Sequence, residues 1–277
     1  MTKVPLILLT NDDGVHSPGL LAAAQAVCDL GRLVVVAPKR QQSSMGRAMP
    51  PATSGVILSE TLQVNACPVL AYSMPGSPAQ TVLYAVMELL DQRPDLVVSG
   101  INYGENLGTS TTVSGTVGAA LQASEFAIPA LAVSRETSKE SHNDPHYREE
   151  VDWSVAIHFT RLFAQAALAQ PLPADVDVLK IDVPAGATPE TPWRVTRQSR
   201  RPYYLALPTG RRDLSLPQAM DYTIRSDHAQ VEPDSDIYAF SVDRVVSVTP
   251  LSLDLTSRVD PERLAGMIDG RRGANGK

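Results

Sequence analysis

The beginning of the chain carries the pattern that most constrains its fold. An apolar run at residues 4–9 stops at the polar turn Asn11-Asp12-Asp13-Gly14, and a second apolar run follows at 33–36. Residues 17–30, between the two runs, place apolar side chains at helical spacing behind a Ser-Pro start, which is typical of a helix N-terminus. A strand, a helix and a second strand form a β-α-β unit, which joins parallel strands by a right-handed crossover. The pattern therefore predicts a parallel sheet at the centre of the molecule.

The same alternation of strands and helices continues along the chain. Further strands and helices are predicted, in order, at 69–73 (strand), 79–90 (helix), 96–98 (strand), 114–124 (helix), 130–133 (strand), 151–169 (helix) and 176–183 (last core strand). Such alternation indicates an α/β protein with an open, mostly parallel sheet. In the common doubly wound order, 3-2-1-4-5, ligands bind beyond the carboxyl ends of the strands next to the first strand.

The character of the chain changes at residue 184, where prolines and charges become frequent. Residues 1–183 are predicted to form the core of the fold, and residues 184–257 a C-terminal arm without a core of its own. The remaining residues, 258–277, are predicted to form a short helix, at 261–268, and a frayed tail.

Two hairpins and one surface segment complete the predicted secondary structure. Residues 56–58 and 62–64 are expected to form an edge hairpin, and residues 237–241 and 244–248 a second one. The polar segment 135–150, which holds His142 and His146, is interpreted as mobile surface, with both histidines in solvent.

Polar side chains follow several of the predicted strands where each strand ends. Asp12 and Asp13 follow the first strand, Ser43 lies in the loop after the second, and Asn102 follows the strand at 96–98. The doubly wound order brings these three loops to one crevice. Two adjacent carboxylates repel each other, and a divalent cation would compensate them. Carboxylate, hydroxyl and amide oxygens are hard ligands that suit Mg, Mn or Ca better than zinc.

The stretch Ser114-Gly115-Thr116 opens a predicted helix with small residues. Free backbone N–H groups at such a start receive anions well, so a metal beside them points to a phosphate ligand. Each element also has an ordinary interpretation: a solvated turn at Asp12 and Asp13, a loop hydroxyl at Ser43, and a simple helix cap at Ser114.

Composition narrows the class of partner. The formal net charge of −6 argues against binding a nucleic-acid polymer, although it leaves room for a small phosphorylated substrate. The two cysteines, Cys28 and Cys67, are expected to be reduced, and no Cys/His spacing suggests zinc. No apolar run has the length of a membrane helix, so we expect a cytoplasmic protein without a membrane partner.

At these residues the sequence resembles the SurE family, which comprises survival proteins with metal-dependent 5'-nucleotidase activity. The resemblance spans nearly the whole chain in the same order. Its motifs lie at residues 7–14, 17–19, 36–38 with Gln42-Ser43, 98–108, 114–120, 236–239 and 246–251.

The resemblance implies a fold, an activity and a site. The fold would be a Rossmann-like three-layer α/β/α architecture with a mixed sheet and a C-terminal extended arm that exchanges between subunits of a homodimer or homotetramer. The activity would be hydrolysis of nucleoside 5'-monophosphates, with 3'-monophosphates as an open extension. One divalent ion per subunit, Mg, Mn or a similar cation, would be held by Asp12, Asp13, Ser43 and Asn102.

A mechanism follows from these expectations. Asn106, Ser114, Gly115 and Thr116 would hold the phosphate while a water attacks in line, and Asp12 or a metal-bound hydroxide would take its proton. Asp12 and Asp13 are thus the expected catalytic residues. A broad-specificity acid phosphatase and a non-catalytic nucleotide- or metal-binding protein remain the alternatives.

Two segments depart from the family pattern. Residues 110–113 lack the aspartate and tyrosine that many members have there, and Gln80 stands where many have aspartate. Both departures leave the expected metal ligands untouched and leave the preferred substrate open.

Overall fold

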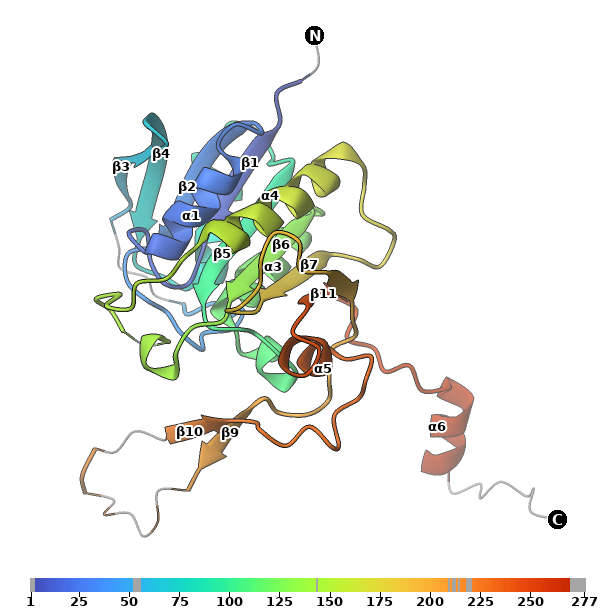
Figure 1. The fold of residues 1–277 in the computed structure, drawn as a ribbon. Coiled ribbons are helices and arrows are strands. Elements are labelled where there is room, and N and C mark those ends of the chain that lie inside the picture. Colours follow the sequence, from blue (N-terminus) through green and yellow to red (C-terminus); the bar gives the residue numbers. More distant parts are fainter. Residues whose placement is uncertain are drawn as a thin grey trace, which may run out of the picture.

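A computed structural model describes residues 3–51, 56–142, 144–208, 210, 213, 215–217 and 221–269. Among these residues, nine strands form one sheet in the order β3-β4-β2-β1-β5-β6-β7-β11-β8, and β9 and β10 form a separate ribbon (Figure 1). The strands are β1 (Leu6–Thr10), β2 (Arg32–Pro38), β3 (Leu58–Val64), β4 (Cys67–Met74), β5 (Leu96–Tyr103), β6 (Ala130–Arg135), β7 (Val178–Val183), β8 (Trp193–Val195), β9 (Tyr204–Leu207), β10 (Asp221–Ile224) and β11 (Val246–Leu251).

Helices connect most of these strands. The α-helices are α1 (Pro18–Val27), α2 (Pro78–Tyr84), α3 (Gly115–Ser124), α4 (Ser154–Ala169), α5 (Asp236–Ser241) and α6 (Pro261–Ile268). A π-helical turn η1 (Ala85–Leu89) and the 3-10 turns η2 (Thr109–Thr112) and η3 (Lys139–Ser141) complete the set within the described part of the chain. No helix there combines the length and the apolar character needed to cross a membrane.

The centre of the sheet has the predicted order. Strands β4, β2, β1, β5, β6 and β7 lie side by side and run parallel, with β1 between β2 and β5. Counting β4 as the third strand, this is the doubly wound order expected from the sequence. The Rossmann-like α/β fold with a mostly parallel mixed sheet is therefore confirmed.

Alternate side chains of β1 feed two separate cores. Ile7 and Leu9 belong to the core under α1 and α4, on one face of the sheet. Leu6 and Leu8 belong to the core under α2 and α3, on the other face. All four are fully buried, because a central strand covered by helices on both faces has no solvent side. The two cores make the three layers.

The predicted hairpin of strands at 237–241 and 244–248 is wrong, although its second strand overlaps β11. Residues 236–241 form the helix α5, capped by the Ser235 side chain, which accepts a hydrogen bond from the Tyr238 amide. Ile237 and Phe240, three residues apart, share one helix face and pack with Tyr203 in a small third core. The periodicity of a short apolar run does not distinguish a strand from a helix, and here the packing on Tyr203 selects the helix.

The strand at 176–183 is also not the last strand of the core. Strand β11 pairs antiparallel with β7, and β8 then pairs parallel with β11. The sheet therefore continues through residues beyond 183. A hairpin does occur in this part of the chain, but β9 and β10 form it.

The edge hairpin consists of β3 and β4, and not of residues 56–58 and 62–64 as the sequence predicts. Residues 58–64 form the single strand β3, which pairs antiparallel with β4. The turn falls at Asn65 and Ala66, whose φ angles of 48° and 64° lie in the left-handed region. The helix predicted at 261–268 is confirmed as α6, whereas residues 270–277 of the predicted tail lie outside the described residues.

We expect Gly19→Ala to destabilise the protein by about 1–3 kcal/mol through overpacking. A methyl group at Gly19, in α1, would lie 2.0 Å from the carbonyl oxygen of Ile101 in β5, so helix and strand would have to separate. Urea unfolding measures the change. Gly186→Ala, where nothing lies within 4 Å of the added methyl group, is the matched control and should be neutral. Equal stability of the two variants would contradict this close packing of α1 on the sheet.

Candidate active site

The turn after β1 is built by the side chain of Asn11. Its Nδ2 donates hydrogen bonds to the Gly14 carbonyl oxygen (3.0 Å) and to Ser17 Oγ (2.8 Å). Its Oδ1 accepts one from the Gly14 amide (3.1 Å). Gly14 has a φ of 111°, which only glycine adopts readily. Because Ser17 also caps α1, the turn is tied to both the strand and the helix, and it presents Asp12 and Asp13 at the carboxyl end of β1.

Asp12 lies against the N-terminus of α3. Thr116 Oγ1 donates to Asp12 Oδ1 over 2.6 Å, and a methyl group at Gly115 would lie 2.7 Å from Asp12 Oδ2. Only glycine at position 115 permits this approach. Burial raises the pKa of Asp12 to about 6, and hydrogen bonds from Thr116 partly offset that rise. The helix that was expected to hold an anion therefore already supports one carboxylate of the chain.

Asp13 is buried on the other side of the turn. Its Oδ2 accepts a hydrogen bond from the Tyr103 amide (3.2 Å), and its Oδ1 accepts one from Gln41 Nε2 (3.2 Å). Its main-chain oxygen accepts one from the Tyr147 hydroxyl (2.7 Å). Burial, followed by the charge of Asp12, raises the pKa of Asp13 well above its usual range.

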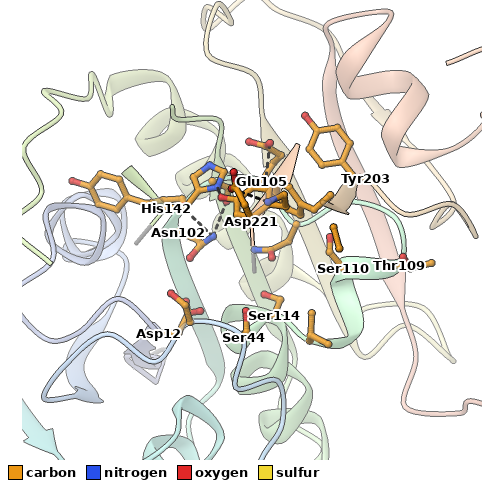
Figure 2. A pocket seen from close by; sticks show the side chains of 18 residues that line it. Asp12, Ser44, Asn102, Glu105, Thr109, Ser110, Ser114, His142, Tyr203 and Asp221 are labelled. Atoms are coloured by element: carbon orange, nitrogen blue, oxygen red, sulfur yellow. Dashed lines mark hydrogen bonds between the residues drawn. The ribbon is translucent and has the colours of Figure 1, made fainter. Parts of the chain in front are cut away.

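A cavity of about 460 Å³ opens beside this turn. Asp12, Ser43 and Asn102 all line it, as do Asn106 and Ser114, whereas Asp13 and Ser43 line an adjoining groove. The structure thus brings the four expected ligand positions to one edge of the sheet. In Figure 2, Asp12, Ser44 and Ser114 lie together at one end of the cavity, with Asn102 above them.

Asn102, near the end of β5, donates from Nδ2 to the Gly104 carbonyl oxygen over 2.6 Å. No described residue donates a hydrogen bond to its Oδ1, which is the atom a cation would use. Ser43 is exposed in the loop after β2. Asp12, Asp13, Ser43 and Asn102 offer only oxygen ligands, and no group of three or more His, Cys, Asp or Glu side chains that could hold a metal occurs among the described residues.

The side chains of Ser114, Thr116 and Asn106, which are expected to hold phosphate, have different hydrogen-bond partners. Ser114 is the N-cap of α3, and its hydroxyl accepts a hydrogen bond from the Val117 amide (3.2 Å). Thr116 is directed at Asp12, as described above. Asn106 lines the cavity, and its Nδ2 donates to Ser134 Oγ over 2.9 Å.

Sequence reasoning missed the opposite end of the cavity. There, His142, Tyr204 and Tyr222 form what we call the aromatic wall. His142 Nδ1 and the Tyr222 hydroxyl are 2.9 Å apart, and the Tyr204 ring stands nearly perpendicular to both of the other rings. The expectation of a solvated His142 is therefore wrong, because the β9–β10 ribbon, some 80 residues away in sequence, packs against it.

Glu105 lines the cavity next to Tyr204 and was also not expected from the sequence. Its side chain is buried, and burial raises its pKa to about 7. The Tyr204 hydroxyl lies 3.2 Å from Glu105 Oε1 and 2.8 Å from the Glu105 main-chain oxygen. The only signal in the sequence was its position in the glycine-rich stretch 103–108, which does not indicate contact with Tyr204, 99 residues away.

Comparisons with known proteins agree with one another. A family model described as "Survival protein SurE" matches residues 7–204. The chain is 42% identical over 266 residues to the protein named 5'-nucleotidase SurE of Thermococcus gammatolerans, covering 95% of this chain and 96% of that one. The chain belongs to the SurE family. The protein named 5'-nucleotidase SurE of Methanocella arvoryzae is 41% identical to this chain over 265 residues. The alignment covers 91% of this chain and 93% of that protein.

Solved SurE structures share the fold. The crystal structure of the SurE protein from Aquifex aeolicus superposes with a TM-score of 0.73 at 29% identity, covering 97% of this chain and all of that one. The family resemblance expected from the sequence motifs is thus confirmed over nearly the full length.

We expect the metal-free protein to lose stability as the pH rises from about 4 to 6. The pKa of Asp12 is raised from 3.8 to about 6, so the folded state binds its proton more tightly than the unfolded state does. The free energy of unfolding therefore falls as this proton is lost, by about 3 kcal/mol. Chemical denaturation with a chelator present, across this pH range, measures the effect.

Asp12→Asn supplies the comparison, because it removes the Asp12 carboxyl group and, with it, the part of the raised Asp13 pKa that the charge of Asp12 causes. The difference in unfolding free energy between this variant and the original chain should grow with pH, and Mn²⁺ should reverse the loss in the original chain. A difference that stays constant with pH would contradict the burial of an uncompensated carboxylate.

Proposed function

We propose that this chain is a metal-dependent 5'-nucleotidase, which hydrolyses nucleoside 5'-monophosphates to nucleoside and phosphate. One observation carries the proposal: Asp12, Ser43 and Asn102 line the same cavity as the N-cap of α3, with Asp13 in the same turn. The SurE relatives of Thermococcus gammatolerans and Methanocella arvoryzae are named 5'-nucleotidases, which supports it. Phosphate release from the 3' isomers of AMP and GMP would show whether 3'-monophosphates are substrates as well.

The residues present fit a divalent cation. Asp12 and Asp13 are adjacent in sequence and only 5% and 2% exposed, and no described Lys, Arg or His forms an ion pair with either of them. Two buried carboxylates without a counter-charge are unfavourable. We propose that Asp12, Asp13, Ser43 and Asn102 hold one Mg²⁺, Mn²⁺ or similar ion per subunit. Such an ion, when bound, supplies positive charge to a phosphoryl group undergoing transfer.

The rest of the site orients the phosphate and a water molecule. The N-terminus of α3, at Ser114, Gly115 and Thr116, gives a positive electrostatic potential at the cavity, and Asn106 lines the same wall. We propose that these groups hold the phosphate oxygens. Asp12 lines the cavity beside them and is the carboxylate that we propose accepts the proton of the attacking water.

The opposite end of the cavity suits a nucleoside. The aromatic wall of His142, Tyr204 and Tyr222 offers flat apolar surfaces, and a nucleobase stacks well on such rings. A nucleoside 5'-monophosphate with its phosphate at α3 and its base at the aromatic wall would span the cavity.

Assembly and location belong to the same proposal. We propose that the catalytic core comprises residues 1–183, that residues 184–257 act as an arm joining subunits into a homodimer or homotetramer, and that the protein works in the cytoplasm. The family resemblance supports these points. Sedimentation of the full chain would test the assembly, since a monomer would contradict it.

We expect Asp13→Asn to lower kcat for AMP by about 10³-fold, because the change removes a charge from the turn that holds the cation. Phosphate release from AMP, GMP, their 3' isomers and p-nitrophenyl phosphate, with Mg²⁺ or Mn²⁺, measures it. Asp29→Asn, at an exposed carboxylate, should keep full activity. A folded, metal-loaded protein that releases no phosphate from any monoester would favour the non-catalytic alternative. Full activity of Asp13→Asn would contradict the assignment of Asp13 as a metal ligand.

We expect Tyr222→Ala to raise KM for AMP by about tenfold, since stacking on one aromatic ring contributes about 1–3 kcal/mol per base. Hydrolysis of glycerol phosphate, which has no base, should change little. The measurement is the change in KM for AMP divided by the change in KM for glycerol phosphate. An equal loss for both substrates would mean that Tyr222 supports the site in general and does not contact the nucleoside.

A further inference from the structure

A buried charged triad lies beneath the loop that carries Asn106. Lys180 and Asp182 project from β7, Asp236 begins α5, and all three side chains are 0% exposed. Lys180 Nζ lies 2.5 Å from Asp182 Oδ2 and 3.3 Å from Asp236 Oδ2. None of the three lines the cavity, so the triad does not contact a substrate there.

The two carboxylates also bind the backbone of residues 105–108, which we call the site loop. The Asn106 amide donates to Asp182 Oδ1 over 2.7 Å, and the Gly108 amide donates to Asp236 Oδ2 over 3.0 Å. Asp236 Oδ1 accepts a third bond, from the Ser199 amide, over 2.9 Å. The triad thus ties the site loop to the sheet and to the C-terminal part of the chain.

Lys180 places a positive charge between the two acceptors. Burial alone would lower the pKa of Lys180, but the carboxylates of Asp182 and Asp236 raise it above its usual value, so its side chain is an ammonium ion. Without that ammonium, two buried carboxylates would face each other and one would take up a proton. A neutral carboxyl group is a weaker acceptor for a backbone N–H than a carboxylate is. The hydrogen bonds from the Asn106 and Gly108 amides to these carboxyl groups would then be weaker.

Close packing and further hydrogen bonds also restrict the backbone of the site loop. At Gly108, where φ is 55°, a methyl group would lie 2.3 Å from the Arg201 carbonyl oxygen, so the loop packs directly on the C-terminal segment. The Asn106 side chain reaches Ser134 in β6, and the Glu105 carbonyl oxygen accepts from Tyr204. A shift of the loop backbone therefore moves Asn106 and the support of the aromatic wall together.

We propose that Lys180 is a positioning residue for substrate binding: through Asp182 and Asp236 it holds the site loop, and with it Asn106, in place at the cavity. The catalytic part of this inference rests on the proposed nucleotidase function. The structural part concerns the site loop alone and is measured without turnover.

The test is Lys180→Met, which removes the charge and keeps a long side chain. Hydrogen–deuterium exchange of the peptide containing Asn106 and Gly108 should become about tenfold faster, since two amides lose charged acceptors. In the metal-loaded protein, KM for AMP should rise about tenfold while kcat changes less than about threefold. A residue that only stabilises the fold would lower resistance to urea without this division between KM and kcat.

Two further variants separate the causes. Arg161→Met removes an exposed ion pair with Asp29, whose charged atoms lie 2.5 Å apart, and should change neither exchange nor KM. Lys180→Met combined with Asp236→Asn leaves Asp182 as a single carboxylate. It should restore slow exchange at Asn106 but not at Gly108, with KM partly recovered.

The outcomes decide as follows. Unchanged exchange of the site loop in folded Lys180→Met overturns the proposal, and faster exchange with unchanged KM overturns the role in substrate binding. If Lys180→Met does not fold, Asp182→Asn carries the same test with a smaller expected effect, about threefold. If the original chain turns over no monophosphate, the proposed function fails separately, and exchange together with the Kd for AMP still judges the positioning role.

Discussion

The burial of two neighbouring carboxylates after β1 is the constraint on which the site depends. A carboxylate that leaves water needs donors or a cation, and this turn draws its donors from elements far apart in sequence. Asp12 is held by Thr116 of α3, and Asp13 by the amide of Tyr103 in β5 and by Gln41 of the loop after β2. The chemistry of the site therefore depends on the order of the strands, because this order brings the three donors to the turn.

Local patterns were enough to predict most of the central architecture. The β1–α1–β2 unit, α3, α4 and α6 have long or well-capped signals, and their strands follow in a regular alternation. The convergence of Asp12, Ser43 and Asn102 on one cavity followed from topology alone, since each lies beyond or near the end of β1 or of a parallel strand next to it. These residues could be found because their spatial proximity is a property of the fold class and not of any particular contact.

Features that depend on particular long-range contacts could not be found this way. His142 was read as solvated because its own segment is polar, and nothing near it indicates that Tyr222 will pack against it. Lys180 and Asp182 alternate with apolar residues, which is typical of a strand with one solvated face, yet both are buried because Asp236 and the site loop cover that face. The short run 237–241 carried two compatible periods, and only its packing on Tyr203 selected the helix.

The position of β11 has a consequence for how the chain is made. Residues 246–251 lie between β7 and β8, and the acceptor Asp236 of the triad comes only ten residues before them. During synthesis from the N-terminus, the first 183 residues therefore emerge with the edge of β7 open and with the site loop lacking one of its acceptors. An unpaired strand edge is a template for association with other chains. The chain is thus open to such association during synthesis, and the cavity is complete only once residues up to Tyr222 have been translated.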